Sequence, residues 1–242
     1  MISYPAYRFI FEQQTRKALL EQELESAREL QRVLIPEKPP ELAGYTISSA
    51  YHPALEVGGD FFQVLPLEGE QTGSCPVILG DVSGKGLRAA MAVSLIVGAV
   101  RTLAEDGRDS GRSEPAPSRP PSGWIDNVPG RLDADGTCML ASAGHPAPYL
   151  NGKEIELPGT LPLGIDPSIE YEETAMKFEP GDRCTLYTDG LLEARVDSGD
   201  IFSFERLQLL LAEAHDADTA SRAAVQFGQE DDITVLTLTR SA

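Results

Sequence analysis

The sequence predicts an α+β protein in which helices flank antiparallel β-strands. Residues 12–34 contain neither Gly nor Pro and are rich in helix-forming residues. Short, largely apolar runs at 77–79, 183–188 and 233–239 predict buried strands. A second helix, 86–104, is apolar on nearly every side, so we expect it to lie between other elements. The 242 residues suffice for one large domain or two small ones.

The composition is strongly acidic. The formal net charge is −18, from 20 basic and 38 acidic residues. Phosphate backbones are neutralised by clustered Lys and Arg, so this charge argues against nucleic-acid binding. It also argues against adsorption to anionic membranes. The acidity is explained either by solubility or by carboxylates that bind cations.

The cysteines and the apolar runs indicate the compartment. Cys75, Cys138 and Cys184 are widely spaced and form no Cys-x-x-Cys pair, so neither a disulfide framework nor a zinc site is expected. The N-terminus has no basic start followed by a clean apolar stretch, and the longest apolar run, 89–100, is too short to span a bilayer. We therefore expect a cytoplasmic protein without membrane insertion.

The first helix carries a heptad-like seam. Its members recur at alternating four- and three-residue steps, with one glutamine among them: Leu20, Leu24, Ala27, Gln31 and Leu34. Two interpretations remain open, an amphipathic helix that packs on its own domain and a linker or dimer helix. Prolines at 36, 39 and 40 end the helix. We expect an N-terminal linker or dimer helix over residues 1–40 and a second unit over 41–242.

Two acidic residues are expected in one hairpin. Residues 45–65 predict two strands, and a Gly-Gly pair just before Asp60 suggests a bulge or a close approach of two backbone segments. A polar hairpin turn then leads into the strand 77–80, which ends at Asp81. Asp60 and Asp81 are thus expected on neighbouring antiparallel strands, near the same end.

The rest of the chain alternates between loops and short strands before two C-terminal helices. Residues 106–123 are rich in Pro, Ser, Gly and Arg, and we expect a loop over 106–130. Asp189 follows a buried strand, as Asp81 does, and Asp231-Asp232 lead into the last strand. The other elements expected are strands at 138–142, 147–150 and 171–178 and helices at 204–215 and 217–227.

Four acidic positions share one context, at the end or the start of a strand: Asp60, Asp81, Asp189, and either Asp231 or Asp232. Buried carboxylates without basic partners cost several kcal/mol each, and Lys and Arg are few beside these positions. Divalent cations between the carboxylates would offset this cost, and a donor set of oxygens alone favours Mg²⁺ or Mn²⁺ over Zn²⁺. Two such ions about 4 Å apart can lower the pKa of a bridging water and orient a phosphoryl oxygen. The pattern indicates hydrolysis of a phosphate ester.

Six motifs occur in a fixed order. They are VGGDFF (57–62), GDVSGKG (80–86), ASAGHPAP (141–148), LPLGI (161–165), LYTDGLLEA (186–194) and EDDITVL (230–236). Together they resemble the bacterial PPM-type serine/threonine phosphatases, in the branch typified by the sporulation stage II protein E phosphatase and the stress-response phosphatases of partner-switching pathways. The resemblance covers about residues 23–238, apart from the region after the helix 86–104.

The resemblance implies a fold and a set of ligands. The implied fold of the unit 41–242 is a sandwich of two antiparallel sheets flanked by helices, with a two-metal centre at one end. Asp60 and Asp81 would be metal ligands, with Asp81 bridging both ions, and the Val82 carbonyl would ligate one ion. Asp189 and Asp231 would complete the other side of the site.

Further residues have supporting or open roles. In the family's Asp-(Asn/Asp)-hydrophobic-Thr motif the first acid is the ligand, which leaves Asp232 beside it as a supporting candidate, together with Gly59 and Ser83. Eukaryotic relatives carry a His at the position of Ser83, so the acid that protonates the leaving group is unassigned here. Lys85 would either contact a substrate phosphate or balance local acidity. His145 is interpreted as a structural turn residue rather than a substrate contact.

The implied function is that of a Mn²⁺- or Mg²⁺-dependent protein phosphatase. Its two cations would activate a water that hydrolyses phosphoserine on an anti-anti-sigma, STAS-type partner, and the helix 12–34 would transmit a signal or form a homodimer. The family also has a second long helix and a strand where this chain has the Pro-rich 106–130 segment, so we expect a helix layer and an edge strand to be missing or degenerate. That gap motivates an alternative, a non-catalytic module that binds a phosphoprotein. A third option is a two-metal esterase for small phosphorylated molecules.

Overall fold

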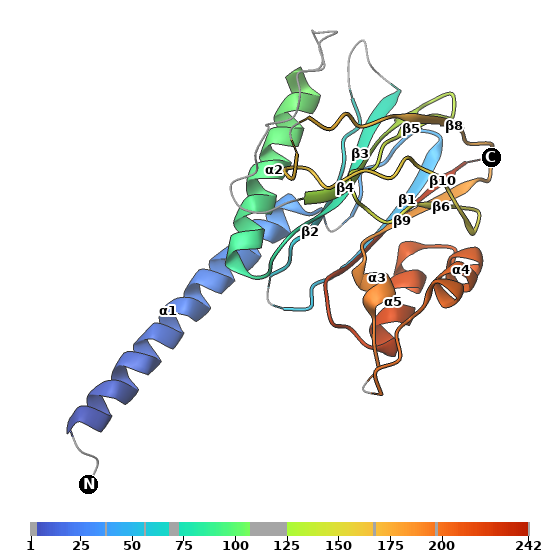
Figure 1. The fold of residues 1–242 in the computed structure, drawn as a ribbon. Coiled ribbons are helices and arrows are strands. Elements are labelled where there is room, and N and C mark those ends of the chain that lie inside the picture. Colours follow the sequence, from blue (N-terminus) through green and yellow to red (C-terminus); the bar gives the residue numbers. More distant parts are fainter. Residues whose placement is uncertain are drawn as a thin grey trace.

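The computed structural model describes residues 4–36, 38–55, 57–67, 73–106, 125–166, 168–196 and 198–241. Within them the chain forms two five-stranded antiparallel sheets with helices on both outer sides (Figure 1). The strands are β1 (Tyr45–His52), β2 (Asp60–Val64), β3 (Ser74–Val82), β4 (Ile125–Asp133), β5 (Thr137–Leu140), β6 (Tyr149–Leu150), β7 (Lys153–Glu154), β8 (Thr174–Lys177), β9 (Arg183–Tyr187) and β10 (Ile233–Arg240). The helices are α1 (Tyr4–Leu34), α2 (Leu87–Asp106), α3 (Gly190–Glu193), α4 (Phe204–Glu213) and α5 (Ala217–Phe227).

The two sheets enclose the main core. One has the strand order β1-β10-β9-β6-β7 and the other β2-β3-β4-β5-β8. Alternate residues of β3 are buried, as expected for a strand with one face on the core. Phe62 and Leu79 of one sheet belong to the same buried cluster as Leu186 and Leu236 of the other. The predicted α+β architecture with two antiparallel sheets is confirmed.

Helix α1 packs on its own domain over only part of its length, and its interpretation as a linker or dimer helix stays a prediction. The N-terminal part projects away from the sheets (Figure 1), and Phe9 and Leu20 are exposed on it. Nearer the C-terminal end, Ala27 is buried in a cluster with Val57 and Ala90. The helix therefore packs on its own domain at one end and leaves apolar side chains uncovered at the other.

Polar side chains fix the C-terminal end of α1. Gln63 Nε2 and Arg101 Nη2 both donate to the Leu34 carbonyl oxygen, at 2.8 and 3.0 Å. Arg101 Nε also donates to Gln63 Oε1 at 2.8 Å. The last carbonyl groups of a helix lack partners inside the helix, so these donors satisfy one of them. They join α1, β2 and α2 in one network.

Helix α2 packs on the β2–β3 edge of its sheet and against α1. Val93 and Val97 of α2 are buried beside Phe61 of β2. Met91 and Leu95 remain more than half exposed, so the expectation that α2 lies between other elements on every side is met on one face only. By length and composition Leu87–Ala104 could cross a membrane, with a mean hydropathy of 1.6, a test that helices packed in soluble proteins also pass.

The other outer side is covered by the C-terminal helices. Helix α5 packs on β1 and β10. The carboxylate of Asp216 caps α5 by accepting a hydrogen bond from the Thr219 amide at 2.7 Å. Leu207 and Leu211 of α4 share a buried cluster with Ala220 of α5. The helices predicted at 204–215 and 217–227 are present, with small differences at their ends.

The predicted loop over 106–130 is wrong for its last residues. Strand β4 begins at Ile125 and pairs with β3 along nine positions and with β5 on its other edge. The strand expected to be missing is therefore present in the interior of the sheet. Pairing with β3 at both residues, and with β5 from Gly130 onward, overrides the weak local strand propensity of Pro129 and Gly130. Residues 107–124, which hold most of the predicted loop, lie outside the described residues.

Candidate metal centre

Asp60 and Asp81 lie directly opposite each other at one end of the β2–β3 pair. The two strands are antiparallel, and Asp60 is the cross-strand partner of Asp81 in their register. The amide of Val82 donates to the Gly59 carbonyl at 3.1 Å, which continues the pairing by one step. Facing positions of an antiparallel pair bring side chains of one face within about 5 Å at Cβ. The predicted hairpin thus places both acids together.

Two threonines hold the Asp60 carboxylate. Thr188 Oγ1 and Thr234 Oγ1 donate to Asp60 Oδ2 at 2.7 and 2.5 Å. The Thr234 amide donates to Thr188 Oγ1 at 2.9 Å, which orients that hydroxyl group. Burial, and then the charge of Asp81, raise the pKa of Asp60 well above its usual range, while the hydroxyl donors oppose the shift. A buried acid with two neutral donors and an acidic neighbour is suited to a cation.

We expect the metal-free protein to gain stability as the pH falls. The raised pKa of Asp60 means that the folded state takes up a proton before the unfolded state does, so stability increases from the folded pKa down to the ordinary one. Urea unfolding in EDTA at about pH 7.5 and about pH 5.5 measures this gain. The gain should be smaller in an Asp60→Asn variant, which lacks this carboxyl group. Equal gains in the two proteins would contradict the assignment.

Gly59 allows the backbone to approach the Asp81 carboxylate. A Cβ atom at Gly59 would lie 2.5 Å from both Asp81 Oδ1 and the Val82 carbonyl oxygen. The two oxygens predicted as ligands of one ion therefore converge on the same point, beside a residue without a side chain. The Gly-Gly pair in the sequence is explained by this close approach.

Gly59→Ala should weaken cation binding. The added methyl group must displace the Asp81 carboxylate or the Val82 carbonyl, so the Mn²⁺ concentration for half-maximal binding should rise about 10- to 100-fold. Gly98→Ala is the matched control, because no atom lies within 4 Å of a Cβ added there. It should leave binding unchanged and stabilise α2 by up to about 1 kcal/mol. Calorimetric titration with Mn²⁺ measures both, and unchanged binding in Gly59→Ala would disprove the close-approach argument.

Adjacent aspartates before β10 have different surroundings. Asp232 is buried, and its two carboxylate oxygens accept hydrogen bonds from the amides of Ala54, at 2.8 Å, and Gly59, at 2.7 Å. The side chain of Asp231 is 34% exposed and forms an ion pair with Lys85 Nζ at 2.8 Å. Asp232 therefore supports the loop that carries Gly59, whereas Asp231 remains open to a cation. The preference for Asp231 as the ligand stays a prediction.

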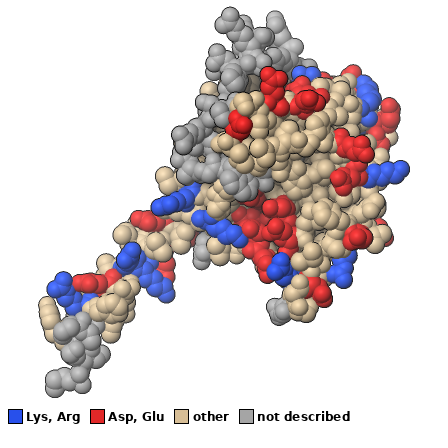
Figure 2. Space-filling model, in the orientation of Figure 1, with Lys and Arg blue, Asp and Glu red and all other residues tan. Residues whose placement is uncertain are grey.

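Asp189 lies at the start of α3, on the side of the site formed by β9 and β10. Its side chain makes no capping hydrogen bond. Burial first, and then the charges of Glu193 and Asp231, raise the pKa of Asp189, while Lys85 opposes the shift. Asp189 and Asp231 thus form a second acidic pair, and acidic side chains gather in a patch between β2 and α3 (Figure 2).

The residues present fit a pair of hard cations in chemistry. The candidate donors are carboxylates and one backbone carbonyl, the set that Mg²⁺ and Mn²⁺ prefer. Among the described residues no group of three or more His, Cys, Asp or Glu side chains is gathered closely enough to hold an ion as the side chains stand. The Lys85 ammonium group contacts Asp231, and its pKa is raised mainly by that residue, with Asp232 and Asp81 adding to the shift. It balances this acidity, as one of the two sequence interpretations stated.

Comparison with known proteins identifies the family. A family model described as "Stage II sporulation protein E (SpoIIE)" matches residues 71–241. The chain belongs to the SpoIIE family. The phosphoserine phosphatase RsbU of Bacillus subtilis (strain 168) is 28% identical over 200 residues, which cover 74% of this chain and 56% of RsbU. The protein IcfG of Synechocystis sp. (strain ATCC 27184 / PCC 6803 / Kazusa) is 26% identical over 237 residues, which cover 81% of this chain and 37% of IcfG.

A solved structure shows the same fold. The SiaA-PP2C domain of Pseudomonas aeruginosa superposes with a TM-score of 0.72 at 22% identity, covering 93% of this chain and 98% of that domain. The resemblance drawn from the six motifs and the fold it implied are thus confirmed. This SpoIIE-family chain spans about half the length of RsbU and less of IcfG.

The sequence did not reveal every residue that shapes the site in this SpoIIE-family chain. Thr188 directly precedes Asp189, and Thr234 lies two residues after Asp232. Their signal was the Thr of TDG and of the Asp-Asp-hydrophobic-Thr run. Gln31 was seen only as a polar interruption of the seam. It is buried and forms two hydrogen bonds with Gly58, donating from Nε2 to the carbonyl at 2.7 Å and accepting from the amide at 3.2 Å.

His145 and Ser83, two residues with open roles, differ in their burial. His145 is buried in the turn after β5, and its Nδ1 lies 3.2 Å from the Pro146 carbonyl oxygen. Burial lowers the pKa of His145 to about 4, so its ring is neutral near pH 7. This agrees with the structural interpretation of the residue. Ser83 is half-buried in the loop after Asp81.

Proposed function

We propose that this chain is a metal-dependent protein serine/threonine phosphatase that hydrolyses phosphoserine on a signalling protein. The observation that carries the proposal is the facing Asp60–Asp81 pair, with Asp81 Oδ1 and the Val82 carbonyl converging beside Gly59. Family membership and the name of RsbU, a phosphoserine phosphatase, support the reaction class.

Each acidic residue has a proposed part in holding two cations, Mn²⁺ or Mg²⁺. Asp60 is held by its two threonine donors, and Asp81, which faces Asp60 across the strand pair, would bridge both ions. Asp189 and Asp231 provide the second acidic pair, and Asp231 would exchange its ion pair with Lys85 for a cation. When bound, such ions lower the pKa of a water between them and neutralise the oxygens of a phosphate. The ammonium group of Lys85, once released, would be available to the substrate phosphate.

The proposed partner is a phosphorylated anti-anti-sigma, STAS-type protein, as for a partner-switching phosphatase. The proposed role of α1 is to transmit a signal or to form a homodimer. Two observations support that role: exposed apolar residues such as Phe9 and Leu20 on the projecting part, and the contact of Gln31 with Gly58 beside the site. Sedimentation of the chain beside a Leu20→Glu variant tests the dimer, which the charge at an apolar interface should dissociate.

A non-catalytic module that binds a phosphoprotein is the second candidate. The observation that favours it is the Lys85–Asp231 ion pair, which places a fixed cation where a metal ligand is expected. Hydrolysis separates the candidates, including the third option of a small-molecule esterase. We expect Mn²⁺-dependent phosphate release from a phosphoserine peptide, and also from p-nitrophenyl phosphate. Release from neither compound by the folded protein would favour the binding module, and release from p-nitrophenyl phosphate alone would favour the esterase.

A further inference from the structure

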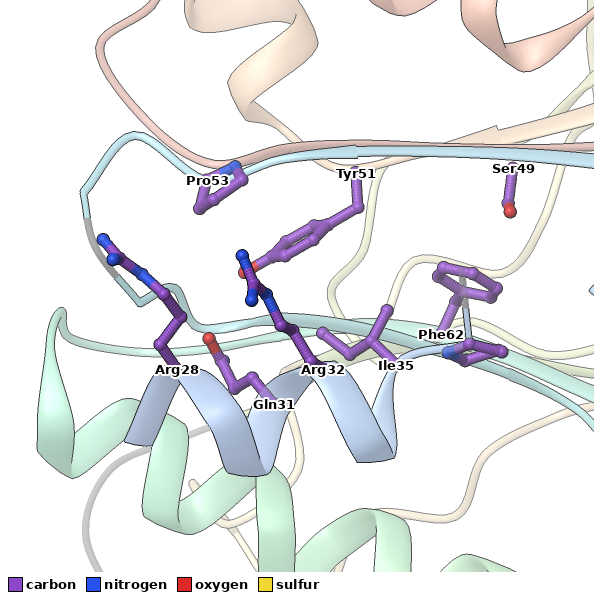
Figure 3. Close-up of a pocket in the computed structure, with 9 residues that line it drawn as sticks. Arg28, Gln31, Arg32, Ile35, Ser49, Tyr51, Pro53 and Phe62 are labelled. Carbon is purple, nitrogen blue, oxygen red and sulfur yellow. The ribbon is translucent and has the colours of Figure 1, made fainter. Parts of the chain in front are cut away.

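A pocket separates the end of α1 from the strand β1. Its volume is about 380 Å³, and its lining residues are Arg28, Gln31, Arg32, Ile35, Pro36, Ser49, Tyr51, Pro53 and Phe62. Figure 3 shows the side chains of Arg28, Gln31 and Arg32 directed from α1 toward Tyr51 and Pro53 on the opposite wall. None of the acidic residues of the candidate metal centre lines this pocket. A volume in this range, with apolar walls and a few polar groups, is typical of small-molecule sites.

The charged lining of the pocket has one sign. Among the described residues, the charged side chains that line it are both arginines, in a chain whose net charge is −18. Arg28 is ion-paired with Glu25 at 3.0 Å, whereas no carboxylate among the described residues pairs with Arg32. A guanidinium group presents several donors in one plane and suits a carboxylate or phosphate. The lining therefore favours an anionic group.

The opposite wall offers a second donor. The Tyr51 hydroxyl group is buried beside the backbone of Gly58, and its proton has no acceptor among the described residues. Burial and the nearby carboxylates of Asp232 and Asp60 raise the pKa of Tyr51, so its phenol stays protonated and can donate. Buried polar groups in native proteins nearly always have partners, so a hydroxyl group left without one in a pocket wall points to a ligand. Phe62 and Ile35 supply apolar surface in the pocket, to one side of the two donors (Figure 3).

We propose that this pocket binds a small organic anion with a flat apolar body, whose anionic group contacts Arg32 and Tyr51 and whose body packs on Phe62 and Ile35. The site goes beyond the proposed phosphatase function and does not depend on it. Gln31 lines the pocket and also holds Gly58, so a bound anion would lie beside the loop that leads to Asp60.

Titration calorimetry with 2-naphthoate tests the site in the full chain, with EDTA present so that metal-bound anions do not contribute. We expect saturable binding of one 2-naphthoate per chain, and at least about tenfold weaker binding of the neutral analogue 2-naphthamide. Arg32→Gln should weaken 2-naphthoate binding about tenfold or more, and Tyr51→Phe about two- to tenfold. Arg16→Gln is the matched control, since Arg16 is exposed on the projecting part of α1.

Three results would overturn the proposal. They are no saturable uptake by the wild type, equal affinity of the Arg32→Gln and Arg16→Gln variants, and binding of 2-naphthamide as tight as that of 2-naphthoate. The Arg32 side chain is exposed to solvent although it lines the pocket, so its replacement should leave the fold intact. Tyr51→Phe provides an independent check, because it removes only the buried hydroxyl group.

Discussion

Asp81→Asn is expected to lower phosphate release from a phosphoserine peptide by about 10³-fold at saturating Mn²⁺. The neutral amide cannot replace a carboxylate that faces Asp60 on one strand and converges with the Val82 carbonyl beside Gly59. The fold should survive, because the substitution also relieves repulsion between Asp60 and Asp81 in the metal-free protein. The rate of phosphate release, compared between the purified, folded wild type and the Asp81→Asn variant, tests this expectation.

Asp135→Asn is the matched control for this substitution. Asp135 is exposed in the turn after β4, whereas β4 pairs with Asp81 at its other end. The control removes the charge of an exposed carboxylate and should retain activity within about twofold, because asparagine can still accept from the Thr137 amide and the lost ion pair with Lys177 is exposed. An Asp81→Asn protein as active as the control would show that Asp81 is not a ligand.

Gln31→Leu is expected to weaken Mn²⁺ binding by about 10- to 100-fold while the sheets stay folded. Leucine keeps most of the side-chain volume but leaves the carbonyl and the amide of Gly58 without their partner. Each buried backbone group left without a hydrogen bond costs about 1–3 kcal/mol, so the loop before Asp60 should loosen. The free energy of unfolding should fall by about 2 kcal/mol or more for the same reason.

Gln22→Leu provides the comparison on the same helix. Gln22 is exposed on the projecting part of α1, so its replacement should leave both metal binding and stability near wild-type values. Calorimetric titration with Mn²⁺ and urea unfolding measure the two quantities separately. If Gln31→Leu lost stability without any change in Mn²⁺ affinity, α1 would support the fold but not the metal centre.

The acidic positions could be predicted from the sequence because local pattern determines them. An apolar run that ends in an acid predicts a carboxylate at a strand end. The Gly-Gly pair predicts the close approach of two backbone segments at Gly59. The motif order then gave the family, and with it the two-sheet fold. For each acidic position the information lies within a few residues of it in the chain, whereas the family required six motifs spread over residues 57–236.

The partners of those acids could not be predicted because they come from distant segments. Thr188 and Thr234 lie 128 and 174 positions from Asp60, and Gln31 lies 27 positions from Gly58. The arrangement of strands in both sheets brings the two threonines to Asp60, and the packing of α1 on the domain brings Gln31 to Gly58. The composition after residue 106 led to a wrong prediction, a loop that extends to residue 130. Pro129 and Gly130 weaken a strand locally, but β4 is paired with β3 on one edge and with β5 on the other.

Helix α1 is buried along only part of its length, and this too depends on contacts with distant segments. Ala27 and Gln31 are buried by contacts with Ala90, Val57 and Gly58, which no local pattern specifies. Leu20 belongs to the same seam but lies beyond the domain and is exposed. The heptad-like pattern therefore indicated an apolar face along α1, but not that only the C-terminal part of that face packs on the domain.

Anomalous scattering from a crystal grown with Mn²⁺ tests whether the four aspartates hold two metal ions. We expect two anomalous peaks about 4 Å apart among the carboxylates of Asp60, Asp81, Asp189 and Asp231, with Asp81 contacting both and the Lys85–Asp231 ion pair broken. Full Mn²⁺ occupancy elsewhere on the protein, with no peak among these four aspartates, would contradict it.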